Sequence, residues 1–107
     1  NFPGLPAHPD HERARELFDG YSGMLSFEPR GGLKAANRFL GKLRIPVVAP
    51  SLGGVETLVT RPAMTSHSSM SLEDRRLMGV SDSLIRISVG IEATEDLIDD
   101  FENALGR

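Results

Sequence analysis

Apolar side chains recur along two stretches of the chain at the spacing of an amphipathic helix. In residues 33–44 and 94–105 they fall three or four positions apart, so each stretch predicts a helix with one buried face. Thr94 is expected to cap the start of the second helix, and Gly106 to end it. Two shorter helices are predicted at residues 10–18 and 71–79, the latter with a capping box formed by Ser71 and Asp74.

Alternation of apolar and polar residues predicts short strands between these helices. The clearest case is the strand predicted at 84–89, in which Ile85, Ile87 and Val89 would face the core. Arg86 and Ser88 lie between them and would face the other way. Further strands are predicted at residues 24–28, 45–49 and 55–60. Short strands separated by helices predict an α+β fold, with a mostly antiparallel sheet of about four strands and helices packed on one face.

Composition bounds what such a fold can do. The chain has 107 residues, no cysteine and a formal net charge of −3. Its length predicts a single domain, and the proline-rich residues 1–9 predict an extended N-terminal linker. The charge gives no electrostatic reason to expect nucleic acid, and no apolar run is long enough for a membrane span. Without cysteine, disulfides and Cys-based zinc sites are excluded, and the three histidines show no further ligands, so no metal is expected. We expect a cytoplasmic protein and, because the chain lacks a starting Met, a piece of a longer one.

Two features could bind an anion. The guanidinium of Arg86 offers a planar fork that matches a carboxylate or a phosphate, although a surface ion pair with an acidic neighbour is the plainer interpretation. The segment Ser51-Leu52-Gly53-Gly54 could bring backbone N–H groups close to a ligand, although it could also be a simple turn. The acidic residues of the last helix are interpreted as its solvated face: Glu95, Asp96, Asp99, Asp100 and Glu102.

Three segments stand in a fixed order along the chain: Ser-Leu-Gly-Gly-Val-Glu-Thr-Leu at 51–58, Arg-Pro-Ala-Met-Thr-Ser-His at 61–67, and Gly-Val-Ser-Asp-Ser-Leu-Ile-Arg-Ile-Ser-Val-Gly-Ile-Glu at 79–92. Together they closely resemble the C-terminal domain of the trans-sulfuration (Cys/Met metabolism) family of pyridoxal-phosphate enzymes. That family includes cystathionine γ-synthase, cystathionine γ-lyase, cystathionine β-lyase and methionine γ-lyase. The resemblance extends over essentially the whole chain and implies the small C-terminal domain of an aspartate-aminotransferase-like fold.

The resemblance also implies roles for particular residues. The arginine that matches Arg86 would hold the α-carboxylate of an amino-acid substrate, with Ser51 and Leu52 contributing to the same site. Ser66 and His67 match a pair near the mouth of the site and are weaker candidates. Pyridoxal 5′-phosphate and its lysine would belong to domains outside these residues, so no catalytic, cofactor-binding or metal-binding residue is expected in this chain.

The reaction implied is γ-replacement or γ/β-elimination at a carbon–sulfur or carbon–oxygen bond, in an enzyme that is a homotetramer. Some lyases of the family carry a glutamate or an aromatic residue just before the serine. This sequence has Pro50 there, which leaves the reaction type open. Two other functions stay open from the residues alone. One is a free-standing regulatory module that binds an amino acid, and the other is an assembly domain with no ligand.

Overall fold

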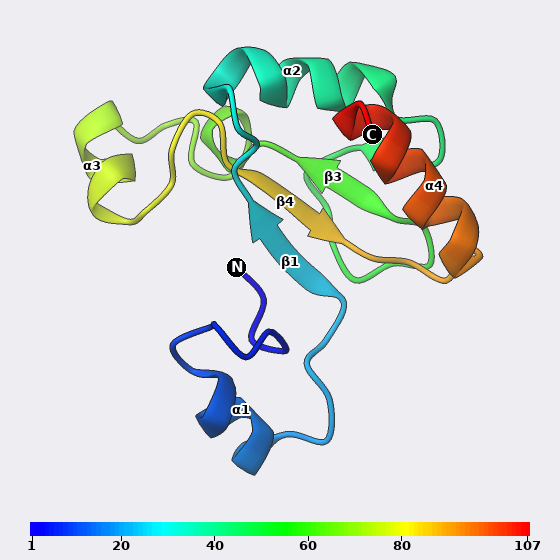
Figure 1. Cartoon of the computed structure of the whole chain (residues 1–107). Helices are drawn as coiled ribbons and strands as arrows, with labels where there is room; N and C mark the ends of the chain where they lie inside the picture. Colours follow the sequence, from blue (N-terminus) through cyan, green and yellow to red (C-terminus); the bar gives the residue numbers. More distant parts are fainter.

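Four strands form one sheet in the computed structural model, which describes all 107 residues (Figure 1). In spatial order the strands are β1 (Met24–Phe27), β4 (Ile85–Ser88), β3 (Leu58–Thr60) and β2 (Val47–Val48). The helices are α1 (His11–Leu17), α2 (Gly32–Lys42), α3 (Leu72–Leu77) and α4 (Thr94–Leu105), with a short 3-10 helix η1 (Pro62–Met64). β4 pairs antiparallel with β1 and β3, whereas β2 and β3 are parallel. The predicted α+β class and mostly antiparallel sheet are confirmed.

The two long helices, α2 and α4, lie side by side over one face of the sheet (Figure 1). Phe39 of α2 is 2% exposed, and its ring meets Phe27 edge-on at a centroid distance of 5.4 Å and stacks on Phe101 at 6.1 Å. Because a fully buried side chain of this size contributes roughly 1.5–3 kcal/mol, these contacts hold the helices on the sheet. The sheet residues that meet them are Leu25, Phe27, Val59, Ile85 and Ile87.

The helix ends follow the sequence at two points and depart from it at one. The Ser71 hydroxyl accepts a hydrogen bond from the Asp74 N–H at 3.1 Å, which confirms Ser71 as the cap of α3. The Asp74 carboxylate accepts from the Ser71 hydroxyl at 2.8 Å and not from its backbone N–H, so the full reciprocal capping box is not formed. Gly106 ends α4 with φ +83°, also as predicted. The prediction that Thr94 caps α4 is wrong. Thr94 is already helical, so Ala93 occupies the cap position and no side chain bonds there.

The acidic residues of α4 are not all solvated, and this corrects the sequence-based interpretation. Asp100 is 6% exposed, and its Oδ2 accepts hydrogen bonds from the backbone N–H groups of Arg44 at 2.9 Å and Ile45 at 3.0 Å. The carboxylate thus satisfies two donors in the turn that connects α2 to β2. One buried acid of α4 therefore fixes the path of a segment far away in the sequence.

All four strands are shorter than predicted: β1 ends one residue early, at Phe27, and β2 is reduced to Val47–Val48. β3 begins at Leu58, because the carbonyl of Val55 accepts from the Ile91 N–H at 2.8 Å outside the regular ladder. β4 ends at Ser88. Val89 lies beyond this end and is 37% exposed, so its predicted place in the core is wrong.

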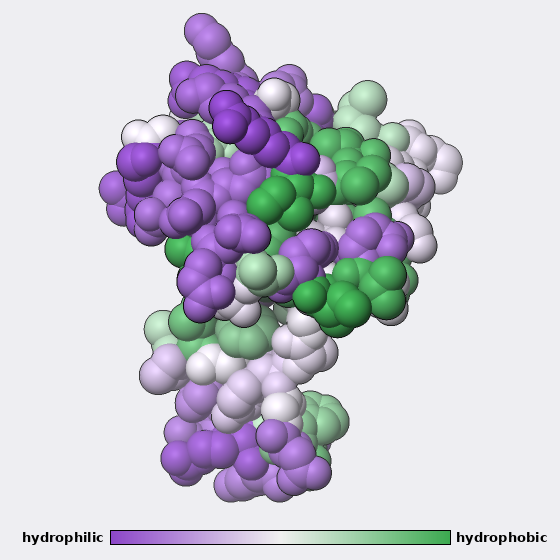
Figure 2. Space-filling view, turned by 90° about the vertical axis from the view of Figure 1, so that its right-hand side faces the viewer, coloured by the Kyte–Doolittle hydropathy of each residue, from purple (hydrophilic) through white to green (hydrophobic).

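Residues 1–23, here called the N-terminal arm, form a separate lobe below the sheet, and Figure 2 shows the narrowing between the two parts. Residues 1–9 fold into consecutive turns rather than the extended segment predicted. Within the arm, His11 Nδ1 lies 2.8 Å from the Pro3 carbonyl oxygen, and the His11 ring stacks on Tyr21 at 5.8 Å. The arm is also attached to the sheet, because the Asn1 carbonyl accepts from the Ser26 N–H of β1 at 3.2 Å. Its role as a linker stays a prediction.

Candidate functional site

Arg86 lies at the centre of the sheet, on the face opposite α2 and α4. Its strand β4 runs between β1 and β3, so Ser26 and Thr60 flank it in register on the same face. Its Nη2 donates to the carbonyl oxygens of Pro50 at 2.9 Å and Ser51 at 3.2 Å. Its Nε is buried without a partner, and no carboxylate forms a salt bridge with it. The ion pair considered from the sequence is therefore not formed, and the guanidinium keeps donors free for another anion.

The Ser51-Leu52-Gly53-Gly54 corner lies beside this arginine, as predicted. Gly53 adopts φ +77°, a conformation that favours glycine, and its N–H donates to the Ser88 hydroxyl at 2.8 Å. Ser51 contacts Arg86 through its carbonyl, while Leu52 is 55% exposed. The structure therefore brings Arg86, Ser51 and Leu52 to one corner of the sheet.

A cavity of about 180 Å³ opens next to the arginine on its β1 side. Arg86, Met24 and Ser26 contribute to its lining, together with Asn1 of the N-terminal arm. The cavity is open, so a small polar molecule could enter it from solvent and reach the guanidinium. A concave surface with one strong, partly free cation is a suitable site for a small carboxylate.

A second set of contacts fixes the corner from behind. The Glu92 carboxylate accepts from the Thr57 hydroxyl at 2.8 Å and from the Thr57 backbone N–H, and the Thr57 hydroxyl accepts from the Gly90 N–H at 2.9 Å. A Cβ at Gly90 would lie only 2.2 Å from the Val55 carbonyl oxygen, so only glycine permits this approach. The end of β4 is thereby attached directly to the segment that follows the corner.

The charge of Glu92 is part of this attachment. Partial burial raises the pKa of its carboxyl, but hydrogen bonds from the Thr57 hydroxyl and from the N–H groups of Thr57 and Glu92 lower it. The net pKa lies below the ordinary value. Glu92 is therefore ionised at neutral pH, and its anionic form is the one that holds Thr57.

The weaker candidates lie in the loop after β3. The Ser66 hydroxyl and His67 Nδ1 are 2.8 Å apart, and the His67 N–H donates to the Pro62 carbonyl at 2.9 Å. The loop reaches the open face through Thr65, whose hydroxyl lies 3.1 Å from that of Thr60, the register neighbour of Arg86. Neither Ser66 nor His67 forms a hydrogen bond with Arg86.

Three further residues shape the site. Strand alternation already predicts that Ser88 shares the face of Arg86, but not that its hydroxyl binds the corner at Gly53. Thr57 and Glu92 carry no such signal: they are 35 positions apart, and no spacing rule connects them. Only the folded chain shows that they act together.

The residues of this chain do not by themselves form a site for pyridoxal phosphate. Lys34 and Lys42, the lysines of the chain, are exposed on α2, which packs against the face opposite Arg86. No cluster of His, Cys, Asp and Glu side chains is arranged to bind a metal ion. No helix combines the length and apolar character of a membrane span. The open face thus carries Arg86 without a lysine beside it.

The sequence model described as "Cys/Met metabolism PLP-dependent enzyme" matches residues 1–106. The chain therefore belongs to this family of pyridoxal-phosphate-dependent enzymes, which confirms the resemblance seen in its motifs. Among curated proteins it is 46% identical to cystathionine gamma-lyase of Bos taurus over 104 residues, which is 97% of this chain and 26% of that protein. It is 41% identical to the chloroplastic cystathionine gamma-synthase 1 of Arabidopsis thaliana, over 97% of this chain and 18% of that protein.

Solved structures agree with these matches. The cystathionine gamma synthase of Xanthomonas oryzae pv. oryzae in complex with cystathionine superposes with a TM-score of 0.94 at 45% identity, covering 98% of this chain and 27% of that one. The cystathionine gamma-lyase of Lactobacillus plantarum complexed with L-serine gives a TM-score of 0.91 at 36% identity, over 98% of this chain and 27% of that one. The chain thus spans about a quarter of the length of most of the relatives it matches.

Proposed function

We propose that this chain is the substrate-carboxylate-binding C-terminal domain of a pyridoxal-phosphate-dependent enzyme of sulfur amino-acid metabolism. The reaction would be γ-replacement or γ/β-elimination at a carbon–sulfur or carbon–oxygen bond. The observation that carries the proposal is Arg86, which stands on the open face with a buried, unpartnered Nε and no carboxylate bound to it. The cofactor would be held by parts of the enzyme outside these residues.

The role of Arg86 follows from the shape of its side chain. A guanidinium binds a carboxylate through two parallel hydrogen bonds and so fixes its orientation as well as its position. The contacts with Pro50 and Ser51 hold one end of the guanidinium against the corner. A substrate α-carboxylate would bind the free Nη1 and displace one of these carbonyls from Nη2. This paired contact would present its reacting carbon in one direction, and such alignment lowers the barrier of the following step.

Ser51 and Leu52 would complete this site. The Ser51 carbonyl contacts Arg86 and leaves its hydroxyl available for a second hydrogen bond to the carboxylate. The exposed Leu52 would cover the aliphatic part of the same ligand. Ser66 and His67 are retained as possible contacts at the edge of the site, through the loop anchored by Thr65.

The experiment is a product assay on the intact protein that carries this chain. The substrates are cystathionine, an O-acylhomoserine with cysteine, and methionine, and the variants are Arg86→Lys and the control Arg76→Lys. We expect turnover of at least one of these substrates and a KM that rises about 10- to 100-fold in Arg86→Lys, because the two-point contact is lost. Arg76 is exposed on α3, and its variant should be unchanged. No turnover of any substrate, or an unchanged KM in Arg86→Lys, contradicts the proposal.

The regulatory-module alternative is separated by a binding measurement. The 107-residue chain alone is titrated with methionine and with homocysteine by calorimetry. A site completed by other domains should show no useful affinity, because only one side of the ligand is contacted. Micromolar binding to the isolated chain would instead support an amino-acid-binding regulatory module.

A homotetrameric assembly and a cytoplasmic location are parts of the same proposal. The first rests on the family resemblance and the second on composition. Analytical ultracentrifugation of the intact protein tests the assembly, with a tetramer expected and a monomer as the contrary result. Cell fractionation tests the location.

A further inference from the structure

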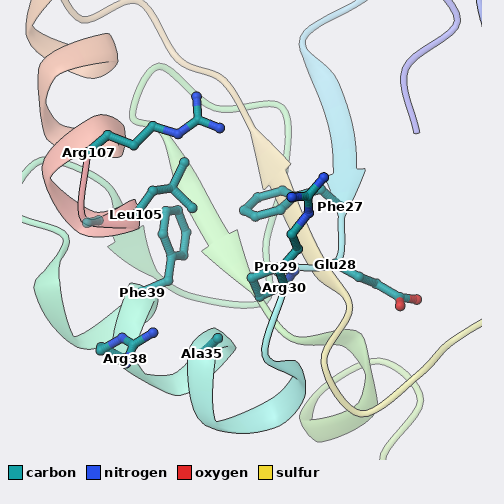
Figure 3. A pocket seen from close by; sticks show the side chains of 10 residues that line it. Phe27, Glu28, Pro29, Arg30, Ala35, Arg38, Phe39, Leu105 and Arg107 are labelled. Carbon is teal, nitrogen blue, oxygen red and sulfur yellow. The ribbon is translucent and has the colours of Figure 1, made fainter.

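A second pocket lies on the other side of the sheet, where the end of β1 meets the start of α2 and the end of α4. Its volume is about 400 Å³. Figure 3 shows how residues from these three elements surround it. Phe27, which lines it, pairs in register with Ile85 and so points to the face opposite Arg86. The pocket is therefore separate from the carboxylate site described above.

The rim of this pocket carries an excess of positive charge. Arg30, Arg38 and Arg107 line it, and none of their guanidinium groups forms a salt bridge or a hydrogen bond with another residue. The one carboxylate in the lining, Glu28, accepts a hydrogen bond from the Ser81 hydroxyl at 2.9 Å, and in Figure 3 it points away from the arginines. The net charge of the chain is negative, but these three unpaired arginines make the rim of the pocket positive. An anion bound there would reduce the repulsion between them.

The floor of the pocket is apolar. The rings of Phe27 and Phe39 meet edge-on at 5.4 Å, and Leu105 stands over them in Figure 3. These three side chains also line a neighbouring cavity of about 220 Å³ whose lining is wholly hydrophobic, with Leu25, Ile87 and Phe101. On the side of the molecule where α4 lies, Figure 2 shows hydrophobic surface set between hydrophilic side chains. Charge and apolar surface thus adjoin each other.

We propose that this pocket binds a small organic anion with an apolar body, its carboxylate or phosphate held at the rim that carries Arg30, Arg38 and Arg107 and its apolar part against Phe27 and the exposed Leu105. Guanidinium groups bind both kinds of anion through paired hydrogen bonds, and aromatic floors bind the apolar part. The inference does not depend on the substrate site, because it uses no residue of that site.

The test is calorimetry on the intact protein that carries this chain, with phenylbutyrate and phenyl phosphate as probes and neutral phenylbutyramide as the uncharged control. The two anions distinguish a carboxylate ligand from a phosphate ligand. We expect saturable binding of at least one anion and at least tenfold weaker binding of the amide. Affinity should also fall as salt is raised, because the charges are at the surface.

Four variants locate the binding. Arg30→Gln and Arg38→Gln should each weaken it about tenfold, since each removes a charged hydrogen-bond donor. Arg86→Lys and Arg76→Gln should leave it unchanged, which separates this pocket from the substrate site. Thermal denaturation of each variant confirms that it is folded. The proposal is overturned if neither anion binds, if the amide binds as tightly as the anions, or if Arg86→Lys abolishes binding while Arg38→Gln does not.

Discussion

The two faces of the sheet are built on the same strands but differ in what they hold. Ile85 and Ile87 of β4 are 0% and 3% exposed under α2 and α4, whereas Arg86 between them reaches the open side. No helix covers that second face. It is bordered by residues 50–57, by the loop after β3 and by Asn1 of the N-terminal arm, which leave a cavity beside the guanidinium. One face therefore holds the buried core, and the other presents the arginine that we propose as the carboxylate-binding residue. In β4 the two kinds of residue alternate.

The largest loss of stability is expected from a substitution on the helix-covered face. Ile85→Ala should lower the free energy of unfolding by about 2–5 kcal/mol, because it removes buried methyl and methylene groups and leaves a cavity. Ile91→Ala is the matched control: Ile91 is 82% exposed, and its change should be within about 0.5 kcal/mol. Urea unfolding followed by circular dichroism measures both. Equal destabilisation by the two variants would mean that the core does not sit where the structure places it.

A smaller loss of stability is expected from a substitution at Gly90, just after the end of β4. Gly90→Ala should cost about 1–3 kcal/mol, since the new Cβ meets the Val55 carbonyl and the backbone must move. Gly41→Ala serves as the contrast. Nothing lies within 4 Å of its Cβ position, and it is helical, so this variant should gain about 0.5–1 kcal/mol. If both substitutions stabilise the chain, the close approach at Gly90 is wrong.

On the open face itself, the Ser88 hydroxyl and the Arg86 guanidinium of β4 both hold the corner. Ser88→Ala removes the acceptor of the Gly53 N–H and should cost about 0.5–1.5 kcal/mol. Although this loss of stability is small, the backbone of the corner beside Arg86 should become more mobile. Hydrogen exchange of the Gly53 amide is the measurement, with faster exchange expected. Unchanged protection would contradict the bond.

The smallest effect is a dependence on pH. Because the folded-state pKa of Glu92 is lowered, the unfolded chain binds its proton more tightly, so stability is lost as pH falls. The stabilisation from Glu92 is complete above the ordinary carboxyl range of about pH 4 and disappears below it. The stability difference between the wild type and Glu92→Gln should accordingly shrink on acidification. A difference that is constant or grows toward low pH would show that the charge of Glu92 does not hold Thr57.

Local patterns in the sequence were enough for the fold class and for the central residue of the site. Strand alternation places Arg86 away from the core, and the predicted cap at Ser71 is present. Both features depend on residues within a few positions of one another. The sequence-based prediction for Thr94 failed because a cap depends on where the backbone turns, and the helix began one position earlier.

Long-range contacts explain what the sequence could not predict. Asp100 looks like any other acid of an amphipathic helix until the turn after α2 brings two backbone N–H groups to its carboxylate. Glu92 and Thr57 are joined in the same way, by a fold that brings the end of β4 against the corner. Polar residues of this kind are paired by the tertiary structure, so their spacing in the sequence does not reveal their partners.

The central claim is that Arg86 binds the carboxylate of an amino-acid substrate, and it is tested most directly by changing the carboxylate. The intact protein is assayed with its best substrate and with the matching α-carboxamide, as wild type and as Arg86→Gln. We predict that the wild type prefers the carboxylate by about 10- to 100-fold in kcat/KM and that Arg86→Gln loses this preference. The variant should also lose about 1–3 kcal/mol of unfolding free energy, because the contacts of Arg86 with Pro50 and Ser51 are lost, and it should remain folded. An Arg86→Gln enzyme that keeps the full preference for the carboxylate would contradict the account.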